Sequence, residues 1–103
     1  MEQPKIKVIY KAPGEPWREM ELDNTLEAFQ AAVGGYIEPI RLTADMVLIC
    51  NEEGRLIPLP ANVRIVGEDI CGPVVICGTY GDEFTDCPCT MANWLRYWIG
   101  GTA

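Results

Sequence analysis

The stretch from residue 23 to residue 60 constrains the fold most, because it places a capped helix directly before several strands. Asn24 is a good N-cap, and Glu27 stands where a capping box needs it. Thr25 is the alternative cap. Apolar residues then recur at helical spacing and predict one buried helix face: Leu26, Phe29, Ala32 and Val33.

A pair of glycines ends this helix and turns the chain. Gly34 stands where a helix stop requires a left-handed residue, a conformation that glycine adopts at little cost. Gly35 lets the chain reverse into a strand over residues 36–42. Pro39 within that strand cannot donate a ladder hydrogen bond, so we expect this strand at the edge of a sheet.

The next segment predicts a buried strand followed by a hairpin. Met46–Cys50 is wholly apolar, as in a strand that is covered on both faces. Asn51–Gly54 has the composition of a hairpin turn, with Gly54 free to take a positive φ, and Leu56–Leu59 is the expected return strand. Residues 23–60 are therefore expected to form a helix packed on a hairpin.

The remainder of the chain adds strands on either side of this unit and one further helix. We expect strands at residues 5–10, 17–22, 62–66 and 73–80, and a last helix at residues 91–99 capped by Thr90. This order predicts the α+β class: a single domain over residues 1–103, with one antiparallel or mixed β-sheet and two helices packed against it.

Five runs of the chain carry a family resemblance. They are Leu26-Glu27-Ala28, Val33-Gly34-Gly35-Tyr36-Ile37-Glu38, Leu48-Ile49-Cys50-Asn51-Glu52-Glu53-Gly54, Leu59-Pro60-Ala61-Asn62 and the apolar stretch Ile70–Gly78. Together these runs resemble the domain of unknown function 3846 family. The resemblance implies a small domain of the kind found in phages, plasmids and other mobile elements, and it carries no catalytic residues to transfer.

Composition excludes several classes of function. Fifteen acidic residues against 8 basic ones give a net charge of −7, which argues against direct nucleic-acid binding by bulk electrostatics. No apolar run approaches the roughly 20 residues of a membrane helix, and no signal peptide is visible. We therefore expect a cytoplasmic protein, in the host cell if it is phage-encoded, with its 5 cysteines reduced.

The cysteines are more typical of core residues than of a metal site. Cys71, Cys77, Cys87 and Cys89 are four candidate thiolates, but their spacing is poor for zinc and the chain has no histidine. Cys50 and Cys77 lie inside apolar strands, where a small buried residue is expected. Cys87-Pro88-Cys89 is the arrangement most suited to a reactive role. We expect no metal and no cofactor.

Catalysis has little support in the sequence. Without histidine, a Cys–His or Ser–His pair within the chain is excluded. The carboxylate pairs Glu52–Glu53 and Asp82–Glu83 fall in predicted turns, where solvated acids are common. The alternative to a non-enzymatic protein is a small metal-dependent nucleotide hydrolase that uses Glu52, Glu53 or Asp82.

The last predicted helix is a candidate interface. Tyr97 lies off the stripe that holds Trp94 and Trp98, so this helix is apolar on more than one side. A second subunit or partner covers such a helix in many proteins, which favours a homo-oligomer with these three aromatics at the interface. A larger core that wraps the helix is an equally good interpretation.

A small-molecule pocket is predicted from polar and aromatic residues near the predicted hairpin. Its expected residues are Trp17, Tyr36, Asn51, Glu53 and Asn62, of which the two asparagines are also common turn residues. We expect a binding protein that antagonises host defence, either by sequestering a small nucleotide-like ligand or by docking on a host protein. A structural interaction module without a ligand is the remaining alternative.

Overall fold

The computed structural model describes residues 4–99, which form strands and short helices of an α+β domain. The elements in chain order are β1 (Lys5–Lys11), β2 (Arg18–Asp23), α1 (Leu26–Val33), β3 (Ile37–Thr43), β4 (Met46–Asn51), β5 (Ala61–Ile65), β6 (Glu68–Cys71), β7 (Val74–Tyr80), β8 (Glu83–Thr85), α2 (Met91–Asn93) and the π-helix η1 (Trp94–Trp98). The predicted fold class is confirmed. No helix within the described residues is long and apolar enough to span a membrane.

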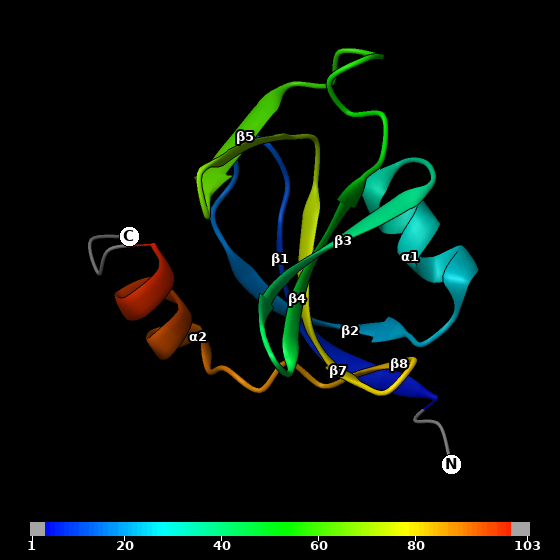
Figure 1. Ribbon diagram of the computed structural model, residues 1–103, viewed down its shortest axis with the longest axis vertical. Helices are drawn as coiled ribbons and strands as arrows, with labels where there is room; N and C mark the ends of the chain where they lie inside the picture. Colours follow the sequence, from blue (N-terminus) through cyan, green and yellow to red (C-terminus); the bar gives the residue numbers. More distant parts are fainter. Residues whose placement is uncertain (1–3, 100–103) are drawn as a thin grey trace.

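Every strand pairing is antiparallel, and the strands form two sheets rather than the single predicted one. The main sheet has the order β2-β1-β7-β4-β3, with β8 paired to one end of β7. The hairpin β5–β6 forms a separate two-stranded sheet. Figure 1 shows α1 against one side of the main sheet and β5 and α2 on the opposite side. The molecule is therefore a sheet covered on both faces.

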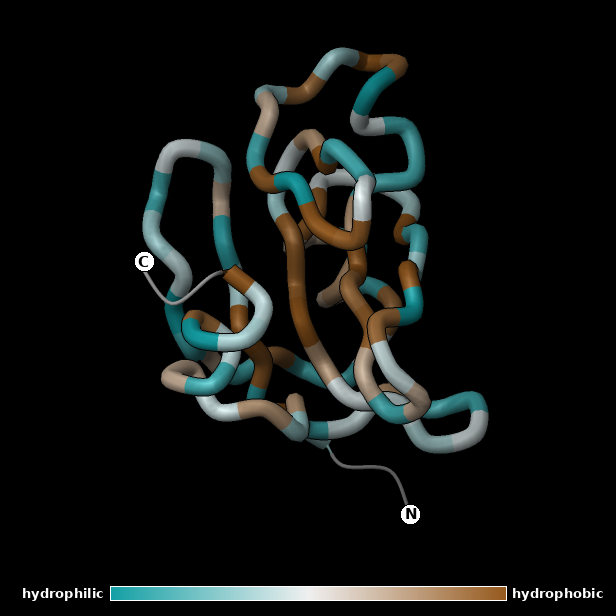
Figure 2. Tube along the Cα trace, turned by 60° about the vertical axis from the view of Figure 1, so that its left-hand side comes forward, coloured by the Kyte–Doolittle hydropathy of each residue, from teal (hydrophilic) through white to brown (hydrophobic). Residues whose placement is uncertain are grey.

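The central strands explain how both faces are buried. All residues of β4 are buried, as the apolar run Met46–Cys50 predicts, and β7 is buried from Val74 to Gly78. Figure 2 shows the apolar, brown stretches concentrated in these inner strands. Alternate residues of β4 and β7 face α1, where they pack with Phe29 and Val33. The other residues face the β5–β6 hairpin and the C-terminal helices, where they pack with Trp94 and residues of the hairpin.

The first helix begins and ends as helix-capping chemistry requires, with one correction. Thr25, rather than Asn24, is the N-cap, and its Oγ1 accepts from the Ala28 N–H at 3.1 Å. The Asn24 amide instead donates to the Phe84 carbonyl. Gly34 ends the helix in the left-handed region with φ 82, as predicted. Leu26, which was expected on the buried face, is exposed.

The edge position predicted for Pro39 is confirmed, because β3 pairs with β4 alone among the described strands. The predicted return strand at Leu56–Leu59 is wrong. Residues 52–58 form consecutive turns, in which the N–H groups of Leu56 and Ile57 both donate to the Glu53 carbonyl. Prolines at 58 and 60 account for the missing return strand, since they remove hydrogen-bond donors that such a strand needs. The chain then enters β5, and it continues into β6, for which the sequence pattern predicts no strand.

The first half of β1 is not paired with β7, and a segment distant in the sequence lies beside it instead. Strand β1 pairs with β7 only from Ile9 onward. Beside the earlier half of β1, the Lys7 N–H donates to the Asp86 carboxylate at 2.8 Å, and the Cys87 N–H donates to the Lys7 carbonyl at 2.8 Å. The chain after β8 therefore continues the sheet beside β1.

In place of the single helix predicted at residues 91–99, the chain forms a short α-helix followed by a π-helix. Thr90 caps the α-helix, as predicted, by accepting from the Asn93 N–H at 3.1 Å. After α2 the chain continues as the π-helix η1. Trp94 is fully buried, stacks on Trp98 at 5.5 Å and meets Trp17 edge-on at 5.2 Å. Its indole N–H is buried without a hydrogen-bond partner in the described part of the chain.

Candidate functional site

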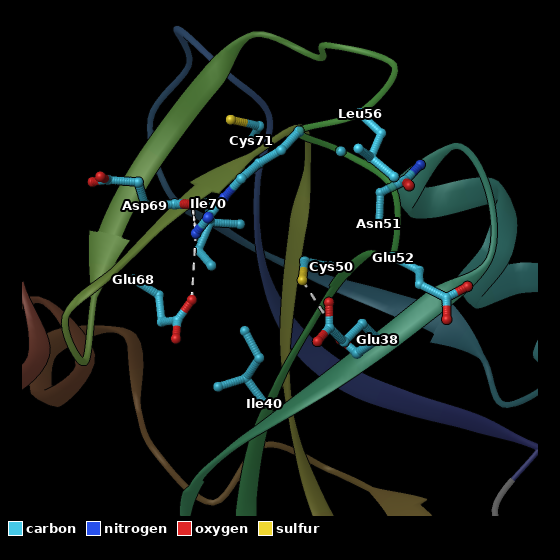
Figure 3. Close-up of a pocket in the computed structure, with 12 residues that line it drawn as sticks. Glu38, Ile40, Cys50, Asn51, Glu52, Leu56, Glu68, Asp69, Ile70 and Cys71 are labelled. Atoms are coloured by element: carbon cyan, nitrogen blue, oxygen red, sulfur yellow. Dashed lines mark hydrogen bonds and ion pairs between the residues drawn. The ribbon is translucent and has the colours of Figure 1, made fainter.

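A hollow lies between the β3–β4 edge and the β5–β6 hairpin; we call it the acidic groove (Figure 3). Its volume is about 270 Å³. The lining residues are Glu38 and Ile40 of β3, Cys50 and Asn51 of β4, Glu52, Gly54, Arg55 and Leu56 of the following turns, and Glu68, Asp69, Ile70 and Cys71 of β6. Carboxylates thus stand on both sides of the groove.

Strand alternation places apolar side chains at the base of the acidic groove. Cys50 and Ile70 are buried and Ile40 is half-buried, and all three pack in the cluster beneath the hairpin. Burial raises the pKa of the Cys50 thiol from 9.0 to about 11. At neutral pH this thiol is therefore protonated, and it contacts the Glu38 carbonyl at 3.6 Å.

The positive charge at the acidic groove interacts with the β6 side of the groove. Among residues 4–99, Arg55 is the only basic residue that lines it, and its guanidinium donates to the Asp69 carbonyl at 3.1 Å and to the Glu68 carboxylate at 3.4 Å. Asp69 also pairs with Arg64 at 2.9 Å. Glu38 and Glu52, by contrast, make no ion pair within residues 4–99. The groove therefore presents uncompensated negative charge on its β3–β4 side.

Apolar side chains project beside the acidic groove; we call Tyr36, Leu56 and Ile57 the apolar tip. Their exposed fractions are 68%, 80% and 50%. Leu56 lines the acidic groove, whereas Tyr36 and Ile57 line a second hollow of about 240 Å³. Leu56 and Ile57 are absent from the predicted pocket because the sequence pattern places them in a strand. The signal against that strand is Pro58, which directly follows the apolar pair and cannot donate a ladder hydrogen bond.

Of the residues predicted for a ligand pocket, three come together. Tyr36, Asn51 and Glu53 line the second hollow. Asn51 is buried, however, and its amide is used by the backbone: Nδ2 donates to the Val33 carbonyl at 3.1 Å and Oδ1 accepts from the Glu53 N–H at 2.8 Å. Asn51 thus ties the end of α1 to the turn after β4.

The other two predicted pocket residues lie elsewhere. Asn62 lies at the start of β5 and joins that strand to neighbouring backbone, since its Nδ2 donates to the carbonyls of Lys11 and Gly72 and its Oδ1 accepts from the Lys11 ammonium at 2.6 Å. Trp17 packs against Trp94 in the core cluster under the hairpin. Both are positioned as structural residues.

The chain as a whole matches the family described as domain of unknown function (DUF3846), over residues 6–98. The chain belongs to the DUF3846 family. No match was found among curated proteins or among solved structures. The family match covers the two N-terminal strands and the Cys-rich C-terminal segment of this DUF3846 domain, in addition to the runs that carry the resemblance.

The aromatics proposed for an interface divide into buried and exposed groups in this DUF3846 domain. Trp94 is a core residue and Trp98 is partly buried against the same cluster, whereas Tyr97 is 70% exposed. The helix is thus wrapped by the core of its own chain on the Trp94 side. Only Tyr97 of the three stands fully available for contact.

Cysteines and carboxylates are dispersed over the DUF3846 domain. No group of three or more Cys, Asp or Glu side chains within residues 4–99 is arranged to hold a metal ion. Burial raises the pKa of the Cys77 thiol to about 12, and burial also raises the pKa of the Cys87 and Cys89 thiols. Glu52 and Glu53 line different hollows, and Asp82 lines a third one beside α1. The residues named for a hydrolase are not gathered.

Proposed function

We propose that this DUF3846 domain is a non-enzymatic binding protein that docks on a partner protein through the apolar tip and the acidic groove. The observation that carries the proposal is the exposure of Leu56, which is 80% accessible at the rim of a groove with unpaired carboxylates. A contiguous group of exposed apolar side chains, as in the apolar tip, marks a protein interaction site in many proteins. The turn that presents Leu56 is also hydrogen-bonded internally, which lowers the entropic cost of binding.

The chemistry of the surface favours a partner that presents an apolar side chain next to a basic one. An apolar side chain of the partner suits the base formed by Ile40 and Ile70, and a Lys or Arg beside it meets Glu38 and Glu52.

Capture of a small ligand in the second hollow is less favoured than docking of a protein. This hollow has about 240 Å³, below the roughly 300–1,000 Å³ of drug-sized pockets, and the amide of its Asn51 is already hydrogen-bonded.

The test is site-specific photo-crosslinking. A photoreactive residue at position 56 should join the protein to a defined partner in host extract, and a Leu56→Asp change in a tagged copy should abolish recovery of that partner. The same photoreactive residue at position 80 is the matched control, because Tyr80 is 83% exposed at the far end of β7. Equal crosslinking from both positions would contradict the proposal.

Native mass spectrometry separates this function from ligand capture. We expect the folded and denatured masses to agree. Extra mass that is lost on denaturation, and that Tyr36→Ala removes, would instead favour a small nucleotide-like ligand in the second hollow. An excess mass that is an integral multiple of the chain would favour a homo-oligomer.

We further propose that the partner is a host protein in the cytoplasm, of the kind that a phage or other mobile element must neutralise. The support is the mobile-element setting that the family resemblance implies. Expression of the wild-type protein should then raise phage plating on a defended host, and Leu56→Asp should not. Equal plating with and without the wild-type protein on every defended host would remove this part of the proposal.

A further inference from the structure

We infer that the free edge of β2 binds an extended basic segment of a partner protein as an added β-strand. This surface goes beyond the proposed function, because β2 and β3 lie at opposite ends of the main sheet. Strand β2 pairs with β1 alone among the described strands, and its six residues contain no proline. An exposed sheet edge of this kind is a template for main-chain pairing.

The register shows which backbone groups of β2 are free. The Asn24 N–H donates to the Pro4 carbonyl at 3.0 Å, which makes this a hydrogen-bonded pair at the end of the β1–β2 ladder. Hydrogen-bonded and non-hydrogen-bonded pairs alternate in antiparallel strands. Glu19 and Glu21 therefore direct their N–H and C=O groups away from β1, toward an incoming strand. Asp23 directs its N–H the same way, while its carbonyl accepts from the Thr25 N–H at 2.9 Å.

The opposite edge of the sheet is closed by the same logic. The Glu52 N–H donates to the Tyr36 carbonyl at 2.9 Å, so alternation places position 39 among the residues that face outward. That position is Pro39, which has no N–H to offer. An added strand would lose its central hydrogen bond at β3, whereas at β2 every outward residue has a donor.

Hollows on both faces of β2 are placed to accept the side chains of an added strand. One hollow, of about 450 Å³, lies between Glu19–Glu21 and the segment Cys87–Thr90. The other, of about 470 Å³, lies between Arg18–Asp23 and the small side chains Ala28, Ala31 and Ala32 of α1. Successive residues of a strand point to opposite faces, so alternate side chains of the partner would enter these two hollows in turn.

The side chains of β2 specify the sequence of this partner. Alternation places Glu19, Glu21 and Asp23 on the face away from α1, while Met20 and Leu22 pack on the α1 side. Lys5 pairs with Asp23 and Lys7 stands opposite Glu21, whereas Glu19 stands opposite Ile9. A segment that alternates basic and apolar residues complements this pattern, and Glu19 gains the most from it.

A second copy of β2 does not fit the edge. Two antiparallel copies related by a two-fold axis normal to a continuous sheet keep the same face up, so residues of like parity stand opposite each other. The register with Glu21 opposite Glu21 places all three acids at 19, 21 and 23 against acids of the other copy, and the next register in either direction still opposes two of them. Like charges directly opposite destabilise a strand pair. The partner is therefore a different protein.

The test uses two synthetic peptides of equal composition, one with alternating Lys and Val and one with the Lys and Val residues in separate blocks. The full-length protein should bind the alternating peptide more tightly in a fluorescence anisotropy titration. Amide exchange measured by NMR should slow at Glu19, Glu21 and Asp23 when the alternating peptide is bound. The amides at Met20 and Leu22 should change little, because they already face β1.

Two variants make the test specific. Glu21→Pro removes an outward donor that β1 does not use, so the fold is retained and peptide binding is lost; thermal unfolding of this variant checks the first point. Glu19→Lys should weaken binding of the Lys–Val peptide roughly tenfold and should bind the matching Glu–Val peptide instead. Asp82→Lys, in the β7–β8 turn, carries the same charge change and should bind as the wild type does.

The inference is overturned if the block peptide binds as well as the alternating one, or if Glu21→Pro binds like the wild type. It is also overturned if the three amides are already protected in a dimer without peptide. Failure of the tip-docking function would show at Leu56 and leave these amides unaffected, so the two proposals fail independently.

Discussion

Asn51 illustrates how one buried polar side chain can organise a surface. It is 5% exposed, and its amide both donates to the end of α1 and accepts from the turn after β4. Position 35 favours glycine, because a β-carbon there would lie 2.8 Å from the Asn51 Nδ2. The Asn51 amide thus connects the end of α1 to the turns at residues 52–58. These turns carry Leu56 and Ile57 of the apolar tip.

We predict that Asn51→Ala lowers the free energy of unfolding by about 2–3 kcal/mol, because it leaves the Val33 carbonyl and the Glu53 N–H without partners. Tyr36→Ala, at the same hollow, should cost about 0.5 kcal/mol or less since that side chain is exposed. Urea unfolding of both variants measures the difference. Equal costs would mean that Asn51 is not the tie between helix and turn.

Residue-level predictions held where a local rule decides the outcome. Gly34, Pro39 and Thr90 are positioned by left-handed φ, the missing N–H and helix capping, which depend on a few neighbours in sequence. The role of Asn51 could not be predicted in this way. Its partners are a helix end 18 residues earlier and a turn, and only the packing of β4 under α1 brings them together.

At the scale of elements, the turns at residues 52–58 need a residue without a side chain at position 54. Gly54 is not in the left-handed region, so its requirement differs from the predicted one. A β-carbon on it would lie 2.6 Å from the Cys71 carbonyl oxygen. The turn therefore packs directly on the backbone at the end of β6, and both Gly54 and Cys71 line the acidic groove.

We predict that Gly54→Ala lowers the free energy of unfolding by about 2–3 kcal/mol, because backbone must shift to admit the methyl group. Gly67→Ala is the matched comparison: Gly67 has φ +79 with open space around it, so the cost is the left-handed strain of about 1 kcal/mol. Chemical denaturation gives both values. The interpretation fails if Gly54→Ala is the milder change.

The elements that sequence patterns predict well are those with a clear hydrophobic periodicity or a continuous apolar run. Strands β1, β2, β4 and β7 and helix α1 stand within a residue or two of their predicted bounds. Strands β6 and β8 are short and polar and form through pairing with a neighbour, which a local pattern does not reveal. The candidate site lies where prediction was weakest, because an apolar pair in a turn has the same composition as a buried strand.

At the scale of the whole molecule, the main sheet separates two apolar cores that each contain a protonated thiol. Cys50 lies in the core under the β5–β6 hairpin and Cys77 in the core under α1. Burial raises the pKa values from 9.0 to about 11 and about 12 respectively. A rise to alkaline pH therefore destabilises the apolar cores on both faces of the main sheet.

We predict that stability is lost as pH rises above 9.0, where the unfolded chain begins to release these thiol protons and the folded chain retains them. Each pH unit in that window lowers the free energy of unfolding by about 1.4 kcal/mol for a fully shifted thiol. Cys77→Ala should flatten this slope relative to the wild type. Denaturant unfolding measured below and above pH 9.0 compares them, and parallel slopes would exclude Cys77 as a cause.

The pairing of β1 with β7 has a consequence for synthesis on the ribosome. Strand β1 leaves the ribosome before β7, beside which it lies in the sheet, and the gap at its other half is filled by residues 86–87. Until β7 and those residues leave the exit tunnel, the β1–β2 hairpin has unpaired edges on both sides. The middle of the main sheet is therefore completed only after the elements between β2 and β7 have been synthesised.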